Sequence, residues 1–278
     1  MAVRAVLLDI DGVLTLSWRP LPGAVEALAE LRSRGLRVAL VTNTTSRDRA
    51  WIVAGLQECG FDVTADDVLT APMLAADYLT RHHPGGRCLL VNSGDLSRDL
   101  AGLDVEAAAG PARGGEPARD EHAAAARVDV VLLGGAGPEF GYETLNRVFA
   151  LWGAGAELVT MNRNLTWATD QGLQLDTGAF LLGLERAGGR MAVDVGKPSP
   201  AFFRSALSRV GVDPAEAMMV GDDLDSDVLA AQAVGLRGVL VRTGKYRHGS
   251  ELASTPRPDH VVHSVADVPA LLDAARPS

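Results

Sequence analysis

The sequence predicts an α/β fold in which helices cover both faces of a parallel sheet. Short apolar runs rich in β-branched residues alternate with segments of helical period, beginning with Val3–Leu8, Val25–Leu31 and Leu36–Val41. Several later apolar runs have no polar face, which is typical of parallel strands buried between helices. Glycines follow the helical segments, where a left-handed residue commonly ends a helix: Gly35, Gly60, Gly188, Gly211 and Gly235.

The later elements follow the same alternation. Further strands are predicted at Arg87–Val91, Asp129–Leu133, Glu157–Thr160, Ala217–Val220, Gly238–Val241 and His260–Val262. One segment breaks the pattern, because Ala107–Arg127 is rich in Ala, Gly, Pro and charge without an apolar period. We expect it to be an irregular or mobile connection at the surface.

Composition and charge limit the classes of partner. The 278 residues are 47% hydrophobic, enough for one large core or two smaller ones. The net charge is −9 without a dense Lys/Arg run, so we expect neither nucleic acid nor an anionic membrane as partner. Cys59 and Cys88 form no CxxC or Cys/His cluster, which predicts neither disulfides nor zinc. Because no signal-peptide core or apolar stretch of about 20 residues occurs, we expect a soluble cytoplasmic protein.

Two carboxylates follow the first predicted strand. Val3–Leu8 leads directly into Asp9 and Asp11, and open α/β sheets bind ligands at the carboxyl ends of their strands. The sequence Asp11-Gly12 is also a hairpin-turn signal. That alternative makes Val13–Thr15 a weak return strand and leaves Asp9 near an apolar core, where an unpaired carboxylate is unfavourable.

A second acidic cluster follows the predicted strand Ala217–Val220 and opens a helical segment. It places four carboxylates within six residues: Asp222, Asp223, Asp225 and Asp227. A helix cap at Asp225 and the positive helix start account for one or two of these carboxylates, but not for all four. If the two acidic strand ends lie side by side, their oxygens form a site suited to Mg²⁺ rather than to zinc.

Two further segments offer groups that bind anions. Thr42, Asn43 and Thr44 follow the second predicted strand at the expected start of a helix, where backbone N–H groups attract phosphate. An ordinary helix cap is the alternative for this patch. Lys197 precedes a helix that begins with a capping serine and a proline, Ser199–Pro200. A lysine in this position is either a solvated surface charge or a phosphate clamp.

These motifs, in this order, resemble the haloacid dehalogenase superfamily. The matching residues are DxDG at Asp9–Gly12, Thr42, Lys197 and GDDxxxD at Gly221–Asp227. Leu21–Leu28, Thr42–Ser46 and Gly196–Pro200 resemble class IIA, and within it the branch that holds the phospholysine/phosphohistidine/inorganic pyrophosphate phosphatase. The resemblance covers the core of the chain and implies a Rossmann-like parallel sheet with an inserted α/β cap domain.

Spacing indicates where the cap lies. About ten residues separate Asp11 from the helix expected near Pro22, too few for a domain, whereas Thr42 and Lys197 are 155 positions apart. The core needs part of that interval for its own βα units. We therefore expect a cap over residues 81–189 and a catalytic core over residues 1–80 and 190–278.

The resemblance also implies a Mg²⁺-dependent phosphatase that hydrolyses a small phosphorylated metabolite, a phosphomonoester or pyrophosphate, through an aspartyl phosphate. In that reaction Asp9 is the nucleophile and Asp11 is the general acid and base. Mg²⁺ is held by Asp9, Asp222 and the backbone carbonyl of Asp11, and it offsets the repulsion between carboxylate and phosphate.

The remaining motif residues have binding and supporting roles in the same scheme. Thr42, the backbone N–H of Asn43 and Lys197 bind the phosphoryl oxygens, with Thr44 in the same patch. Two further carboxylates support these residues. Asp227 positions Lys197 or metal-bound water, and Asp223 assists Asp227.

Substrate specificity is expected from the cap. Candidate contacts lie in the polar stretch between Glu157–Thr160 and a predicted helix at Gly178–Ala187: Asn162, Asn164, Trp167, Asp176 and Thr177. Ordinary loop residues and a helix cap are the alternative for these positions. By the habit of the class, a homodimer through the cap is a further expectation.

Three other functions compete with the phosphatase. A phosphomutase on the same fold transfers the phosphoryl group to a sugar, but the cap position argues against it. A phospho-acceptor signalling domain also combines acids, a hydroxyl and a lysine, yet it has about half this length and no cap. A silent binding protein is disfavoured because buried carboxylates without metal chemistry only destabilise a fold.

Overall fold

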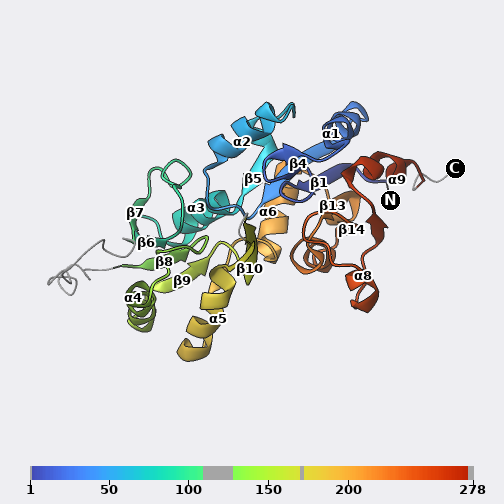
Figure 1. Ribbon diagram of the computed structural model, residues 1–278. Helices are drawn as coiled ribbons and strands as arrows, with labels where there is room; N and C mark the ends of the chain where they lie inside the picture. The colour runs from blue at the N-terminus through green and yellow to red at the C-terminus, as the bar shows by residue number, and fades with distance from the viewer. Residues whose placement is uncertain (1, 109–127, 170–171, 275–278) are drawn as a thin grey trace. The chain divides into compact units, whose positions relative to one another are not determined.

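The computed structural model describes residues 2–108, 128–169 and 172–274, and these residues form two compact units (Figure 1). The first unit comprises the chain up to Thr42, Arg49–Thr70 and the chain from Lys197 onward. The second comprises Asn43–Asp48 and Ala71–Gly196. The predicted cap boundaries, residues 81 and 189, stay a prediction, and the second unit begins earlier in the chain than residue 81. Most of the predicted irregular connection, Ala107–Arg127, lies outside the described residues, and Ala107 itself ends a strand.

The first unit is built on a parallel sheet in the order β15-β14-β13-β1-β4-β5. Its strands are β1 (Ala5–Asp9), β4 (Arg37–Thr42), β5 (Val68–Thr70), β13 (Ala217–Gly221), β14 (Arg237–Val241) and β15 (His260–Val262). β1 lies between β4 and β13, so the chain order reverses at β1. Open α/β sheets bind ligands at the carboxyl ends of the strands at such a reversal.

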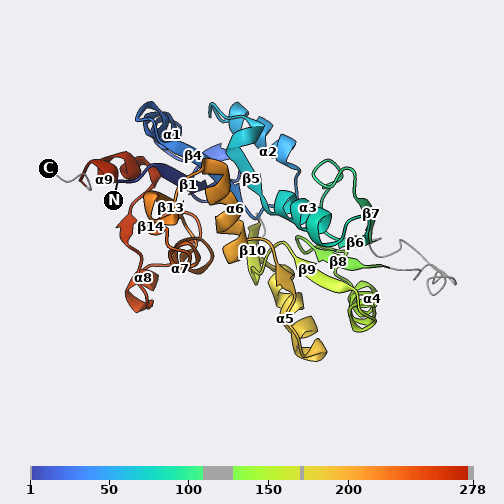
Figure 2. The same cartoon turned by 180° about the vertical axis from the view of Figure 1, so that it is seen from behind.

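Helices cover both faces of this sheet. The helices of the unit are α1 (Ala24–Ser33), α2 (Arg49–Glu58), α6 (Pro200–Val210), α7 (Ala230–Ala233), α8 (Ser250–Ala253) and α9 (Val268–Ala274), with short 3₁₀ turns at Ala65–Asp67, Pro214–Glu216 and Val265–Asp267. One face buries Val6 and Leu8 of β1 against Leu28 of α1 and Ile52 of α2. The two phenylalanines of α6, Phe202–Phe203, are fully buried, and α6 packs along the sheet in the view from behind (Figure 2). No helix in the described part of the chain is long and apolar enough to cross a membrane.

The second unit has its own parallel sheet in the order β12-β9-β8-β6-β7. Its strands are β6 (Arg87–Val91), β7 (Asp104–Ala107), β8 (Val130–Leu133), β9 (Glu157–Thr160) and β12 (Val193–Asp194), with a separate antiparallel hairpin of β10 (Thr166–Thr169) and β11 (Gly172–Leu175). Its helices are α3 (Ala71–His82), α4 (Tyr142–Gly153) and α5 (Thr177–Gly188). The core packs Val131 and Leu133 of β8 against Trp152 of α4 and Leu181 of α5.

The predicted α/β fold class is confirmed, and most predicted strands occur within a residue or two of their expected bounds. The hairpin alternative for the first acidic pair is wrong, because β1 pairs in parallel with β4 and β13 rather than with a returning Val13–Thr15. The chain instead makes a short antiparallel hairpin further on, between β2 (Thr15–Leu16) and β3 (Arg19–Pro20).

Candidate active site

The ends of three adjacent strands bring the predicted polar residues together in the first unit. Asp9 is the last residue of β1 and pairs in register with Val41 of β4, which places Thr42 at the same sheet edge. Asp222 directly follows β13. Asp9, Asp222 and Thr42 are all buried, so these polar groups are held in the protein rather than in solvent.

Asp9, Asp222 and Asp227 form one carboxylate cluster. Each contributes an oxygen to a group in which all the atoms lie within 4.8 Å of one another. Lys197 Nζ lies 2.7 Å from Asp9 Oδ1 and 2.7 Å from Asp227 Oδ1. Lys197 is 3% exposed. The alternative of a solvated surface lysine is therefore wrong, since this ammonium is fixed by two carboxylates.

The cluster carries more negative charge than Lys197 can balance. Burial, together with the nearby charges of Asp9 and Asp227, raises the pKa of Asp222 to about 8. Burial and Asp9 also raise the pKa of Asp227, against the lowering effect of Lys197. Burial lowers the pKa of Lys197, but Asp227 and Asp9 outweigh it and the net shift is upward.

Asp222 has an oxygen that meets no hydrogen-bond donor in the described part of the chain. Asp222 Oδ2 accepts the backbone N–H of Lys245 at 2.7 Å. Asp222 Oδ1 is buried and has no partner among the described residues. A buried carboxylate oxygen without a donor, beside two further carboxylates, fits the oxygen-only donor set of a hard divalent cation.

The turn after β1 presents Asp11 differently from Asp9. Asp11 is exposed and is not part of the three-carboxylate cluster. Partial desolvation of its carboxyl still raises the pKa of Asp11, against the lowering effects of Lys245, the Ser17 backbone N–H and Lys197. Gly12 is required next to it, because its φ is +85° and an added Cβ would overlap Asp222 Oδ2.

The helix start after β13 is capped by Asp223. Its Oδ1 accepts the backbone N–H groups of Asp225 at 3.2 Å and Ser226 at 3.1 Å. The expected cap at Asp225 is wrong, since the turn starts earlier with a π-helical segment, Leu224–Leu229. Asp227 Oδ2 accepts the backbone N–H of Asp223 at 3.3 Å, so the two acids brace each other while Asp227 holds Lys197.

The predicted phosphate patch at residues 42–46 is only partly as expected. The helix α2 begins at Arg49, so Thr42–Ser46 do not stand at a helix start, and that expectation is wrong. Residues 43–48 instead form a connection that belongs to the second unit, where Asn92 Nδ2 donates to the Thr45 carbonyl at 3.1 Å. Phosphate binding by Asn43 and Thr44 stays a prediction.

Comparisons with known proteins show the family of this chain. A family model described as haloacid dehalogenase-like hydrolase matches residues 6–106, and one described as HAD-hydrolase-like matches residues 194–268. The phospholysine phosphohistidine inorganic pyrophosphate phosphatase of Rattus norvegicus is 35% identical over 276 residues, which are 97% of this chain and 94% of the relative. The chain belongs to the haloacid dehalogenase-like hydrolases.

Solved structures place this hydrolase in class IIA of the superfamily. The p-nitrophenyl phosphatase from Archaeoglobus fulgidus matches with a TM-score of 0.83 and 26% identity, over 98% of this chain and 100% of that one. The glycerol phosphate phosphatase from Mycobacterium tuberculosis, solved with magnesium, matches with a TM-score of 0.80 and 30% identity, over 97% and 78% of the two chains. The present hydrolase is a phosphatase.

The predicted cap contacts of this hydrolase lie in the second unit, and most of them make structural hydrogen bonds. Asn162 is buried, and its side-chain oxygen accepts the Asn164 N–H at 2.9 Å. Asp176 caps α5 by accepting the Thr177 N–H at 2.8 Å, as the helix-cap alternative expected. The Thr177 hydroxyl donates to the Gly134 carbonyl. Trp167, on β10, is 42% exposed, and substrate contact by any of the five stays a prediction.

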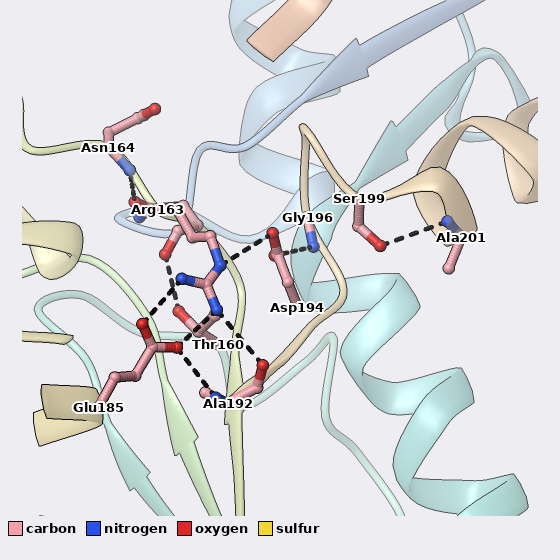
Figure 3. A network of polar contacts seen from close by, with 10 residues as sticks. Thr160, Arg163, Asn164, Glu185, Ala192, Asp194, Gly196, Ser199 and Ala201 are labelled. Atoms are coloured by element: carbon pink, nitrogen blue, oxygen red, sulfur yellow. Dashed lines mark hydrogen bonds and ion pairs between the residues drawn. The ribbon is translucent and has the colours of Figure 1, made fainter. Parts of the chain in front are cut away.

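A buried ion-pair network joins three elements of the second unit (Figure 3). The guanidinium of Arg163, after β9, binds both oxygens of Glu185 on α5, at 2.7 and 3.2 Å. Its Nε lies 3.4 Å from Asp194 Oδ2 on β12. Burial raises the pKa of Asp194 to about 6, although Arg163 and the Gly196 N–H lower it. The network fixes the chain immediately before Lys197.

Sequence reasoning missed two residues of the site, Thr243 and Lys245, in the loop after β14. Thr243 Oγ1 donates to the Gly12 carbonyl at 2.5 Å, and Lys245 donates to Asp222 as described above. The signal was available, because both residues follow the carboxyl end of a buried parallel strand, just as Asp9 and Asp222 do.

Proposed function

We propose that this phosphatase depends on Mg²⁺, hydrolyses a small phosphorylated metabolite and uses Asp9 as its nucleophile. The observation that carries the proposal is the buried cluster of Asp9, Asp222 and Asp227, with Lys197 at hydrogen-bond distance from Asp9 and an unpartnered oxygen on Asp222. A buried excess of carboxylates is unfavourable unless a cation binds there, and a bound cation then also attracts an anionic substrate.

Asp9 and Asp11 divide the covalent chemistry. The Asp9 carboxylate attacks phosphorus, a bond forms between its oxygen and the phosphorus, and the bond to the leaving oxygen breaks. Asp11 gives a proton to that leaving oxygen, which suits a carboxyl group whose pKa is raised. Asp11 then takes a proton from water, the water oxygen bonds to phosphorus, and Asp9 is released.

The other residues of the cluster bind and orient. Lys197 holds one Asp9 oxygen and offers positive charge to the phosphoryl oxygens, and Asp227 keeps the ammonium in place. Thr42 ends the neighbouring strand and supplies a hydroxyl for the same oxygens. Asp9, Asp222 and the Asp11 backbone carbonyl would hold Mg²⁺, which when bound offsets the repulsion between carboxylate and phosphate.

Names of relatives support the substrate class. One relative is named for phospholysine, phosphohistidine and inorganic pyrophosphate, and two structural neighbours are named for p-nitrophenyl phosphate and glycerol phosphate. These compounds share a phosphoryl group on a small leaving group, so we propose a small phosphate ester, phosphoramidate or diphosphate as substrate.

The test compares Asp9→Asn with Asp225→Asn on 4-nitrophenyl phosphate in the presence of Mg²⁺. Asp225 is exposed and lies in the same acidic segment as Asp222, so its variant removes a carboxylate without touching the cluster. We expect Asp9→Asn to lower kcat by about 10³-fold or more, because the nucleophile is lost. Asp225→Asn should stay within about twofold of wild type, as for an exposed position.

Circular dichroism and thermal unfolding check that both variants are folded. Turnover by Asp9→Asn within tenfold of wild type would remove Asp9 from the mechanism. A chelator should also stop wild-type turnover, and added Mg²⁺ should restore it, whereas continued turnover in chelator contradicts the metal dependence.

A further inference from the structure

The loop after β14 brings a second lysine to the acidic cluster of the first unit. The Thr243 hydroxyl donates to the Gly12 carbonyl, and the Lys245 backbone N–H donates to Asp222 Oδ2. The first bond joins residues 231 positions apart in the chain, and the second joins residues 23 positions apart. They fix the backbone of Lys245 beside the carboxylates whatever its side chain is.

The side chain of Lys245 has a different environment from that of Lys197. The Lys197 side chain is 4% exposed and has two carboxylates at 2.7 Å, whereas the Lys245 side chain is 46% exposed. Within the described residues the ion pair of Lys245 is with Asp223 Oδ2 at 3.9 Å, which is beyond hydrogen-bond distance. An ammonium has three N–H donors, so Lys245 keeps donors for a ligand.

The charge of Lys245 nevertheless acts on the whole cluster. Burial lowers the pKa of Lys245, but the charges of Asp9, Asp222, Asp227 and Asp223 outweigh it and raise the pKa. In turn, Lys245 lowers the pKa of Asp11 and of Asp222. The backbone bond of Lys245 to Asp222 and the 3.9 Å ion pair of its ammonium with Asp223 place that ammonium beside the carboxylates around which the phosphoryl group has to bind.

The balance of charge suggests which part of the substrate needs this ammonium. Lys197 is already paired with Asp9 and Asp227 and serves the transferred phosphoryl group. A substrate with a second negative group next to that phosphoryl would meet the remaining carboxylates and be repelled. An exposed ammonium beside them attracts such a group and hydrogen-bonds to it.

We propose that Lys245 is a specificity-determining residue that binds a second anionic group adjacent to the transferred phosphoryl, and so favours diphosphates over simple monoesters. This role rests on the proposed phosphatase function. Lys245 is not part of any of the four sequence motifs. The proposed role belongs to its side chain, because its backbone N–H makes the contact with Asp222.

The experiment measures wild type, Lys245→Met, Lys245→Arg and Arg247→Met with saturating Mg²⁺. Arg247 is an exposed cation of the same loop, so its variant removes equal charge away from the cluster. KM and kcat are measured for 4-nitrophenyl phosphate. For inorganic pyrophosphate, KM and kcat are measured if it is hydrolysed, and its inhibition constant is measured if it is not. The inhibition constant of inorganic phosphate serves as the reference.

We expect Lys245→Met to weaken pyrophosphate binding about tenfold more than it weakens 4-nitrophenyl phosphate, with the change in KM or the inhibition constant rather than in kcat. Lys245→Arg should recover most of the loss, and Arg247→Met should match wild type. If Lys245 had a purely structural role, Lys245→Met would weaken the binding of both ligands equally, and Lys245→Arg would not restore it.

Three results would overturn the proposal. They are an equal loss for both ligands in Lys245→Met, no loss for either, and a wild type that binds pyrophosphate no better than inorganic phosphate. Failure of the proposed function gives a different result, because wild type would then not hydrolyse 4-nitrophenyl phosphate at all.

Discussion

Replacing Asp222 by Asn should stabilise the metal-free protein while abolishing its response to Mg²⁺. Asp222 is 1% exposed, and its pKa is raised from 3.8 to about 8 by burial and by Asp9 and Asp227. Asparagine keeps an oxygen for the Lys245 N–H and places an N–H₂ donor at the position of Oδ1, the buried oxygen that meets no donor among the described residues. The variant therefore removes an unfavourable charge without losing the existing hydrogen bond.

The magnitude follows from linkage between protonation and folding. Because the folded pKa of this acid lies above its unfolded value, the folded state binds more protons between pH 4 and pH 8, and wild-type stability falls as pH rises through that range. At pH 7, about three pH units above 3.8, the stability that wild type has lost is on the order of 4 kcal/mol, because each pH unit contributes about 1.4 kcal/mol. Relaxation of the neighbours reduces it, so we expect a gain of about 2–4 kcal/mol.

Thermal unfolding in chelator, at several pH values, measures this gain. We expect the midpoint of Asp222→Asn to lie about 5–10 °C above wild type at pH 8, with a smaller difference at pH 5. Mg²⁺ at 100 times its dissociation constant should stabilise wild type by about 2.7 kcal/mol and leave the variant almost unchanged. Asp225→Asn, an exposed aspartate of the same segment, should show neither effect.

A metal-free Asp222→Asn variant that is no more stable than wild type at pH 8 would refute the destabilising charge of Asp222. An equal rise of both midpoints with Mg²⁺ would show that Asp222 contributes nothing to the cation site.

Two further substitutions test the backbone and the second unit. Gly12→Ala should lower kcat/KM for 4-nitrophenyl phosphate at least tenfold, because its Cβ displaces Asp222. The control is Gly35→Ala, whose φ of +75° is also positive but whose added Cβ meets no atom within 4 Å. Equal steady-state kinetics in the two variants would contradict the overlap. Arg163→Met should destabilise the second unit by about 3 kcal/mol in denaturant unfolding, because the 5% exposed carboxylate of Glu185 loses its partner. The loss should be larger at pH 8 than at pH 5, because Asp194, whose pKa is about 6, is then charged without its cation, and a loss independent of pH would argue against its part in the network.

The apolar pattern predicted the strands well because their burial leaves little ambiguity. Arg87–Val91, Glu157–Thr160 and His260–Val262 have the predicted bounds. The hairpin of β10 and β11 was missed, because its strands have four residues each and mix polar with apolar residue types. Such a hairpin leaves no clear periodic signal.

Local sequence was less informative about where helices begin and which unit a loop joins. Asp223 and Asp225 are both good capping residues, and choosing between them requires the helix start to within a residue or two. The assignment of residues 43–48 to the second unit depends on long-range bonds such as Asn92 to Thr45, which no local pattern records. The carboxyl ends of strands were the reliable guide, and applying that rule to β14 would also have found Lys245.

The interleaved order of the two units limits how this chain can be recombined with relatives. A single insertion could be exchanged by cutting twice, but residues 43–48 belong to the same unit as Ala71–Gly196, and α2 lies between them in the chain. A chimera that imports only the long segment would separate the Asn92 amide from the Thr45 carbonyl that it binds. Transplanting specificity therefore requires grafting both pieces, with four junctions, one at each end of Asn43–Asp48 and of Ala71–Gly196.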